Sequence, residues 1–304
     1  MKQICIGFGL LVISSLNAFS CDQCSCASSG FMGIVPQFGK HYIGLRYQYQ
    51  NFRTTHSSSI IEGLALDKSV EHFHTVEMFG SYVPHWRVQV LASMPFHYRT
   101  QKSELEGTFT GYGLGDAWLG VNYTVIKTPD TLGRKVRHNL ILGAGLKTPT
   151  GPTNLKQDNE LLNMNLQPGS GSWDPNFRAR YIIRIKRWGI SSAADFRLNT
   201  KNRNGYKFGN RVNGFLGAFY WTVYRNMTFM PQLAVMSDHA WKDSDNGVIQ
   251  IPTGGFSTWA RTNLQVGYKR FIWNVGYSVP MFHDLSSGEV TPKHQCNFSL
   301  LITI

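Results

Sequence analysis

Residues 86–99 read WRVQVLASMPFHYR, and apolar and polar side chains alternate along this stretch. The apolar set is Trp86, Val88, Val90, Ala92, Met94, Phe96 and Tyr98, and the polar set includes Arg87, Gln89, Ser93, His97 and Arg99. Successive side chains of a β-strand point to opposite faces, so a period of two predicts a strand with one apolar face. Its length exceeds the usual strand of about five or six residues. It matches the alternating segments of about ten residues that form transmembrane β-barrels.

The same alternation recurs along the chain and predicts about twelve strands, an even number as bacterial single-chain barrels require. The predicted strands are 41–52, 71–83, 86–99, 114–126, 137–147, 175–187, 189–199, 210–224, 227–238, 255–268, 271–282 and 294–304. Tight joins are expected at Pro84-His85, Arg187-Trp188, Arg225-Asn226 and Lys269-Arg270, and an intermediate one at 127–136. The long joins are 53–70, 100–113, 148–174, 200–209, 239–254 and 283–293.

These joins predict an all-β fold, an antiparallel transmembrane β-barrel with short periplasmic turns and long external loops. A soluble β-sandwich also alternates, and it remains the competing fold. The composition excludes two other classes. The 304 residues contain no apolar stretch of the roughly 20 residues that a membrane-spanning helix needs. The hydrophobic content of 42% is too high for a disordered chain.

The first residues have the layout of a secretory signal peptide. Met1 and Lys2 are followed by an apolar run from Ile4 to Ile13 and by small residues up to Ser20. We therefore expect a signal peptide at 1–20, a cysteine-rich periplasmic segment at 21–39 that could plug the lumen, and an outer-membrane barrel at 40–304. Lipid attachment to Cys21 is the alternative to simple cleavage before it.

Three cysteines, Cys21, Cys24 and Cys26, stand directly after the expected cleavage site. In an oxidising periplasm a disulfide such as Cys21–Cys24 is the default expectation. Three thiolates this close could instead hold a soft metal ion. His72, His74 and Glu77 are not expected to form a metal site, because the two histidines share one strand face and Glu77 lies on the other. No bound cofactor is predicted.

Three motifs resemble a known family. They are Gly113-Leu114-Gly115-Asp116, Lys147-Thr148-Pro149-Thr150-Gly151, and the run from Leu166 to Asp174, LQPGSGSWD. Their order and spacing resemble the putative meta-pathway phenol-degradation outer-membrane barrels, over a region from about residue 40 to the end. The resemblance implies an outer-membrane transporter and does not identify its cargo. From the residues alone, glycines at bends and prolines at strand ends favour a structural role for these motifs over ligand binding.

If the apolar face meets lipid, the polar face lines the lumen. The expected lumen cations are Arg87, Arg99, Arg178, Arg180, Arg184, Arg197 and Arg261, and the expected acids are Glu77, Asp116 and Asp195. These charges could pair in a ladder that stabilises the barrel. Alternatively, the excess of cations could give the lumen a preference for anionic or aromatic-acid solutes.

The sequence therefore predicts an outer-membrane channel for small, hydrophobic, aromatic or anionic solutes, without enzymatic activity. A metal- or redox-linked protein that uses the cysteine cluster is one alternative. A hydrolase is the other, because Asp238-His239 lies near Asp243 and Asp245, although no oriented nucleophile accompanies them. Expected partners are outer-membrane lipid, lipopolysaccharide near the basic external loops, the barrel-assembly machinery and a small solute. No nucleic-acid module is visible.

Overall fold

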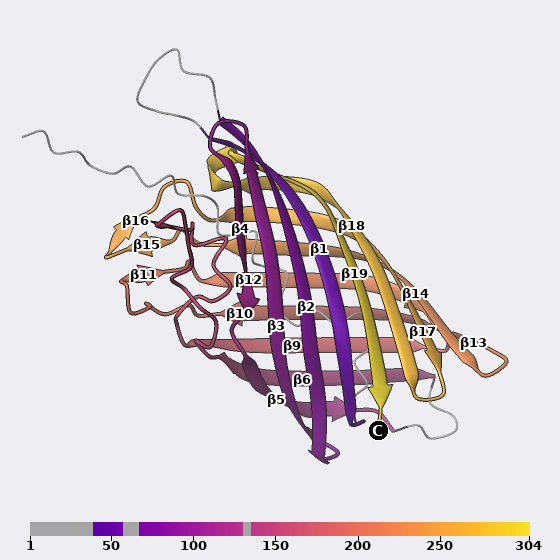
Figure 1. The fold of residues 1–304 in the computed structure, drawn as a ribbon. Helices are drawn as coiled ribbons and strands as arrows, with labels where there is room; N and C mark the ends of the chain where they lie inside the picture. Colours follow the sequence, from indigo (N-terminus) through magenta and orange to yellow (C-terminus); the bar gives the residue numbers. More distant parts are fainter. Residues whose placement is uncertain (1–38, 57–66, 130–134) are drawn as a thin grey trace, which may run out of the picture.

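The computed structural model describes residues 39–56, 67–129 and 135–304, which form a closed antiparallel barrel of twelve strands (Figure 1). The first wall strands are β1 (Tyr42–His56), β2 (Asp67–His85), β3 (Val88–Ser103), β4 (Gly107–Leu114) continued by β5 (Trp118–Lys127), and β6 (Val136–Lys147). The remaining ones are β9 (Asp174–Ile185), β10 (Trp188–Arg197), β12 (Arg211–Tyr220) continued by β13 (Thr222–Tyr224), β14 (Met227–Ala240), β17 (Gly255–Tyr268), β18 (Phe271–Leu285) and β19 (Val290–Thr303). The barrel closes where β1 pairs with β19.

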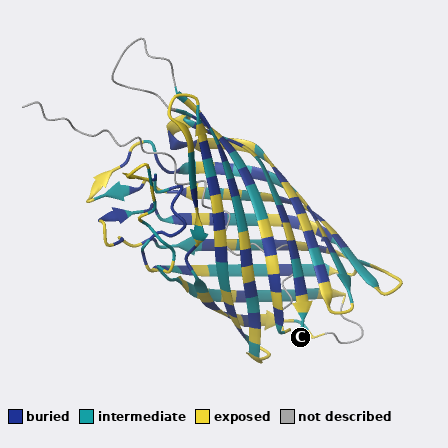
Figure 2. Ribbon diagram, viewed as in Figure 1, coloured by how far each residue is buried: buried dark blue, intermediate teal, exposed yellow. Residues whose placement is uncertain are grey.

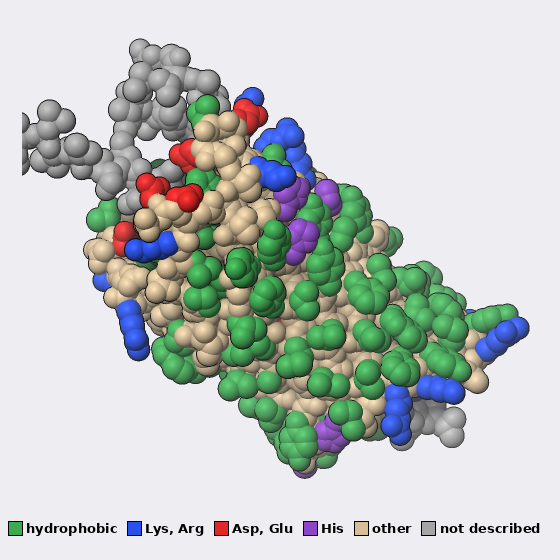
Figure 3. All heavy atoms as spheres, viewed as in Figure 1, with side chains coloured by type: hydrophobic (Ala, Val, Ile, Leu, Met, Phe, Trp, Pro, Cys, Tyr) green, Lys and Arg blue, Asp and Glu red, His purple; other side chains and the backbone are tan. Residues whose placement is uncertain are grey.

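The apolar face of the wall points outward, as the alternation requires. Val90, Phe96 and Tyr98 of β3 are exposed, whereas Gln89 and His97 between them are buried. Figure 2 shows the same alternation of exposed and buried residues along the wall strands, and Figure 3 shows apolar side chains covering the visible side of the barrel. A soluble sandwich would bury that apolar face, so this arrangement excludes the competing fold and confirms the predicted barrel.

The strand ends differ from the prediction at the rims. The turn after β2 is Trp86-Arg87 rather than Pro84-His85, and the turn after β9 is Lys186-Arg187 rather than Arg187-Trp188. Strands β1, β2 and β3 also extend beyond the predicted ends, so the hairpin between β3 and β4 contains residues 104–106 instead of the predicted 100–113. Ladder pairing continues there although the apolar alternation has stopped. The alternation of apolar and polar residues marks contact with lipid and not backbone hydrogen bonding. The prediction therefore ended these strands too early.

The external loops contain short elements of their own. They are β7 (Lys156–Gln157), β8 (Glu160–Leu161), β11 (Tyr206–Lys207), β15 (Ser244–Asp245), β16 (Val248–Ile249) and the 3-10 turn η2 (Ser286–Gly288). Strands β11, β15 and β16 form a small sheet. In the part of the chain that the structure describes, no helix has the length and apolar character needed to cross a membrane.

Candidate functional site

The inner face of the barrel carries most of the predicted lumen charges. Arg178, Arg180 and Arg184 follow one another on the inner face of β9, because every second residue of a strand shares a face. The other inward positions are Arg99 on β3, Arg197 on β10, Arg261 on β17, Glu77 on β2, Asp195 on β10, and Asp116 at the break between β4 and β5. The sequence pattern therefore places these side chains on one continuous surface.

Arg87 does not join this surface. It lies in the exposed turn between β2 and β3, where its guanidinium stacks at 4.4 Å from the ring centre of Trp86 and donates to Tyr123 Oη at 3.3 Å. The predicted strand began two residues too early, so Arg87 was assigned to the polar face of a strand that starts at Val88. In the structure it belongs to the periplasmic rim.

Arg46 of β1 is an inward cation that the sequence reasoning missed. Its guanidinium pairs with the Glu77 carboxylate on the neighbouring strand, and both side chains are buried. The register places Arg46 directly opposite Glu77. The signal was present in the sequence, because Arg46 alternates with Leu45 and Tyr47 and shares its face with Gln48 and Gln50.

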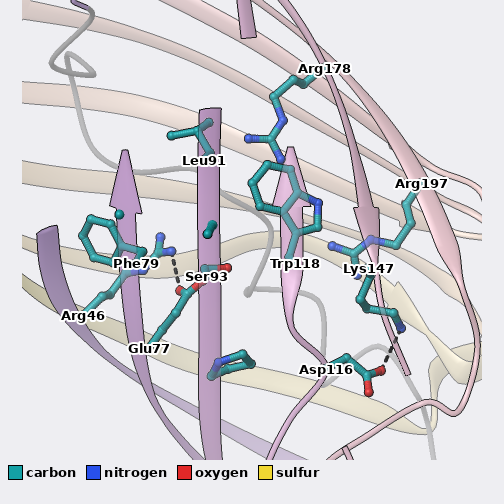
Figure 4. Close-up of a pocket in the computed structure, with 13 residues that line it drawn as sticks. Arg46, Glu77, Phe79, Leu91, Ser93, Asp116, Trp118, Lys147, Arg178 and Arg197 are labelled. Carbon is teal, nitrogen blue, oxygen red and sulfur yellow. Dashed lines mark hydrogen bonds and ion pairs between the residues drawn. The ribbon is translucent and has the colours of Figure 1, made fainter. Parts of the chain in front are cut away.

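A small cavity of about 70 Å³ lies beside this ion pair (Figure 4). Its lining includes the cations Arg46, Lys147, Arg178 and Arg197 and the acids Glu77 and Asp116. The guanidinium of Arg178 lies 4.1 Å from the ring centre of Trp118, and its Nε is 3.7 Å from Asp195 Oδ2. The indole Nε1 of Trp118 donates to Asn176 at 2.7 Å. The lining of this small cavity thus combines more cations than acids with apolar side chains such as Phe79, Leu91 and Trp118.

The three sequence motifs meet at one point of the wall. Lys147 Nζ contacts Asp116 at 3.3 Å and Asp174 at 2.5 Å. Asp116 also accepts from the backbone N–H of Gly151 at 3.0 Å and from both the N–H and the hydroxyl of Ser170, at 2.8 and 2.7 Å. We call Asp116, Gly151, Lys147, Ser170 and Asp174 the motif cluster. Each acceptor of Asp116 is used by the protein itself, which favours the predicted structural role.

The loop at 148–173 fills the external mouth of the barrel. Leu162 and Leu166 are buried in an apolar cluster with Phe52, Phe73, Leu285 and Val290, which belong to strands β1, β2, β18 and β19. Arg99 Nη1 donates to the carbonyl oxygens of Asn165 and Gln167, at 2.7 and 2.8 Å. We call this segment the external plug. The sequence reasoning placed a plug at 21–39, and that segment, apart from Gly39, lies outside the described residues.

A wider cavity of about 570 Å³ opens at the periplasmic end. Its apolar lining includes Ile182, Phe219, Trp221, Met230 and Ile272, and its cations are Lys40, Lys127, Arg137, Arg184 and Lys269. Arg184 stacks over Trp221 at 4.2 Å. No aspartate or glutamate lines this cavity among the described residues. We call it the periplasmic vestibule, a chamber lined by apolar, basic and neutral polar side chains.

Some of the remaining candidates lie outside the described residues, and those that are described belong to the wall or its loops. Cys21, Cys24 and Cys26 lie outside the described residues, and Cys296 is a free thiol. Within the described ranges, no three His, Cys, Asp or Glu residues are placed to bind a metal ion. Asp243 is buried and accepts from Tyr206 Oη and the Gly209 N–H, both at 2.7 Å, so it holds the loop together. His72 and His74 face outward, each with Nδ1 at 2.8 Å from a tyrosine hydroxyl.

Comparison with solved structures agrees with this architecture. The COG4313 outer membrane channel from Pseudomonas putida F1 superposes with a TM-score of 0.63 at 13% identity, covering 90% of this chain and 100% of the other. The β domain of the Bordetella autotransporter BrkA gives a TM-score of 0.49 at 8% identity, covering 87% and 100%. No family model and no curated relative matches the sequence. The fold is that of outer-membrane β-barrels.

Proposed function

We propose that this chain is a bacterial outer-membrane channel for small anionic solutes that carry an apolar or aromatic part. The observation that carries the proposal is the charge of the inner wall. The inward-facing cations on the wall strands are Arg46, Arg99, Arg137, Lys147, Arg178, Arg180, Arg184, Arg197, Arg211 and Arg261. The corresponding acids are Asp67, Glu71, Glu77, Asp174, Asp195 and Asp238, with Asp116 at the strand break. A narrow lumen with an excess of one charge concentrates the opposite ion.

The periplasmic vestibule supports the solute class. Its apolar side chains can cover the hydrophobic part of a solute, while its five cations can meet a carboxylate. An aromatic acid combines these two features. The motifs that resemble the phenol-degradation barrels form the structural motif cluster rather than a binding pocket, so the resemblance does not identify the cargo.

The placement of the chain follows from the same proposal. After removal of a signal peptide, the barrel would be inserted by the barrel-assembly machinery, for which the alternating last strand from Phe298 to Ile304 is the expected signal. The apolar belt would face lipid, and the basic external rim would face lipopolysaccharide. Passage also requires the external plug to move, since Leu162 and Leu166 occupy the external mouth.

Single-channel recording in a salt gradient tests the proposal. We expect the reversal potential to show anion preference, and the double substitution Arg180→Gln, Arg261→Gln to reduce that preference about two- to threefold, by lowering the local positive potential. The matched control is Arg187→Gln with Arg270→Gln, two exposed turn residues. Vesicle swelling should be faster with benzoate than with benzyl alcohol. Cation preference of the parent protein would contradict the proposal.

A further inference from the structure

The outward-facing side chains of β3, β2, β1 and β19 change in chemical character from the middle of the wall toward the external rim. The strand register aligns its outward residues in rows that cross these neighbouring strands. The first row consists of Phe96, Val76, Tyr47 and Phe298. The next row toward the external rim consists of Tyr98, His74, Tyr49 and Cys296. The third row consists of Thr100, His72, Asn51 and His294. Lys102, Val70, Arg53 and Thr291 form the row beyond. Apolar, aromatic, amide-imidazole and basic side chains thus follow one another toward the external rim.

Four exposed cations gather at the outer end of this zone. Arg53 and Lys102 stand in the basic row, Lys68 pairs with Thr55 further out, and Lys293 lies in the bulge between His294 and Pro292. Figure 3 shows Lys and Arg side chains above a group of histidines and the apolar surface on the visible face of the barrel. Across four strands the patch is about 14 Å wide, from a strand spacing of about 4.8 Å. We call it the outer-wall basic patch.

Within the described residues, no ion pair involves Arg53, Lys68, Lys102 or Lys293. The exposed Glu104 lies next to Lys68, to whose carbonyl its N–H donates. On the outward strand faces the cations are confined to one arc of the barrel, since those of β9, β10, β12, β14, β17 and β18 carry no Lys or Arg in the structure. The exposed cations of the other external loops, Lys156, Lys201, Arg203 and Lys242, lie outside the strand wall. What distinguishes the patch is that its cations continue directly into the outward rows of the wall.

The rows below the cations provide hydrogen-bonding groups. His72 Nδ1 lies 2.8 Å from Tyr49 Oη and 3.0 Å from Asn51 Nδ2, and His74 Nδ1 lies 2.8 Å from Tyr47 Oη. When the tyrosine donates, the imidazole proton is on Nε2, so each ring is a donor to an external acceptor. His294 stacks on Tyr49 with ring centres 5.6 Å apart. A ligand here would meet cations, imidazoles and an apolar surface in that order of depth.

We infer that the outer-wall basic patch binds the phosphate groups of lipopolysaccharide at a defined site. The ligand must be amphipathic, because the cations continue directly into aromatic and aliphatic rows that face hydrocarbon. It must be anionic, and it must lie at the external rim. Phosphorylated glycolipid of the outer leaflet has these three properties, with its phosphates at the level of the cations and its acyl chains along the apolar rows. The inference rests on the proposed outer-membrane placement, but it does not depend on transport.

The test measures lipopolysaccharide binding to the full-length barrel in detergent. We expect the variant Arg53→Gln, Lys68→Gln, Lys102→Gln, Lys293→Gln to lose roughly tenfold or more in affinity, because each interfacial cation contributes to anionic lipid binding. The matched control neutralises four exposed cations at the periplasmic turns, Lys186, Arg187, Arg225 and Arg270, and should keep the parent affinity. Unboiled gel mobility confirms that both variants remain folded.

Two further binding measurements distinguish the phosphates of the lipid from free inorganic phosphate. Dephosphorylated lipopolysaccharide should bind the parent protein as weakly as the intact lipid binds the patch variant. Inorganic phosphate should not displace the lipid. Equal losses in the two quadruple variants, unchanged binding in the patch variant, or full displacement by inorganic phosphate would each overturn the inference. Anion selectivity of the channel is measured separately, so failure of this site and failure of the proposed transport function remain distinguishable.

Discussion

Lys147 Nζ lies 2.5 Å from Asp174 Oδ2, at the register pair where β6 ends and β9 begins. The same ammonium lies 3.3 Å from Asp116, at the break between β4 and β5. One cation therefore connects three segments of the wall at the point where regular strand pairing stops. Asp174 is fully buried, so its negative charge depends on this partner and on the groups that donate to it.

Substitution of Lys147 by Met should destabilise the barrel strongly. The change leaves two buried carboxylates without their cation, and removal of one partner from a buried ion pair costs about 3–5 kcal/mol. Urea unfolding followed by the gel mobility of unboiled samples measures this loss. Lys156→Met is the matched control, because Lys156 is exposed on the same loop. Equal midpoints for the two variants would contradict the role assigned to Lys147.

The external plug should respond to a single methyl group at Gly111. A Cβ at this position would lie 2.0 Å from the carbonyl oxygen of Leu166, a distance that forces the backbone of the plug to move. We expect Gly111→Ala to shift the plug out of the mouth and to raise single-channel conductance. Gly80→Ala is the control, because its Cβ would meet Tyr42 O at an ordinary 3.5 Å. Unchanged conductance in Gly111→Ala would show that the plug does not limit flow.

Trp118 should be a stability determinant of the inner wall. Its ring lies over two glycines, since a Cβ at either Gly120 or Gly145 would come within 2.2 Å of it. Trp118→Phe removes the hydrogen bond to Asn176 and weakens the stack with Arg178, so we expect a loss of about 1–3 kcal/mol from the free energy of unfolding. Urea titration measures it, with Trp188→Phe as the control at an exposed position. A loss no larger than in the control would contradict this assignment.

The sequence predicts the wall well because lipid contact imposes a strict period. The twelve strands, their inward and outward faces, and the positions of Arg178, Arg180 and Arg261 all follow from alternation. The motif cluster was also expected to be structural, but not as a junction of three segments. Pairing between Lys147, Asp116 and Asp174 depends on wall geometry that no local pattern records.

The external plug could not be predicted in the same way. Residues 148–173 read as a polar loop with scattered leucines, and nothing local indicates that Leu162 and Leu166 enter the mouth. Their partners Phe52, Phe73, Leu285 and Val290 come from both ends of the chain. The rims were also misplaced, because strand pairing continues beyond the lipid, where alternation ends. Arg87 was assigned to the lumen for the opposite reason, because the alternation continues through Trp86 into a turn that lies outside β3.

The free edge of β4 provides a last test. This strand pairs with β3, and its other edge has no strand partner in the described part of the wall. Gln157 of the plug occupies that edge instead. Its Oε1 accepts from the Thr110 N–H at 3.1 Å, and its Nε2 donates to the Thr108 carbonyl at 2.9 Å. The amide side chain therefore provides the two hydrogen bonds that a neighbouring strand would supply.

Gln157→Leu keeps a similar volume but cannot form either hydrogen bond. We expect the Thr110 amide to exchange with solvent deuterium up to about tenfold faster, since one hydrogen bond contributes about 0.5–1.5 kcal/mol. Amides of β3 that pair with β2 should be unchanged and serve as an internal reference. Lys156→Leu controls for added apolar surface on the neighbouring residue. If exchange at Thr110 stayed the same in Gln157→Leu, the edge of β4 would owe its protection to packing of the plug rather than to this side chain.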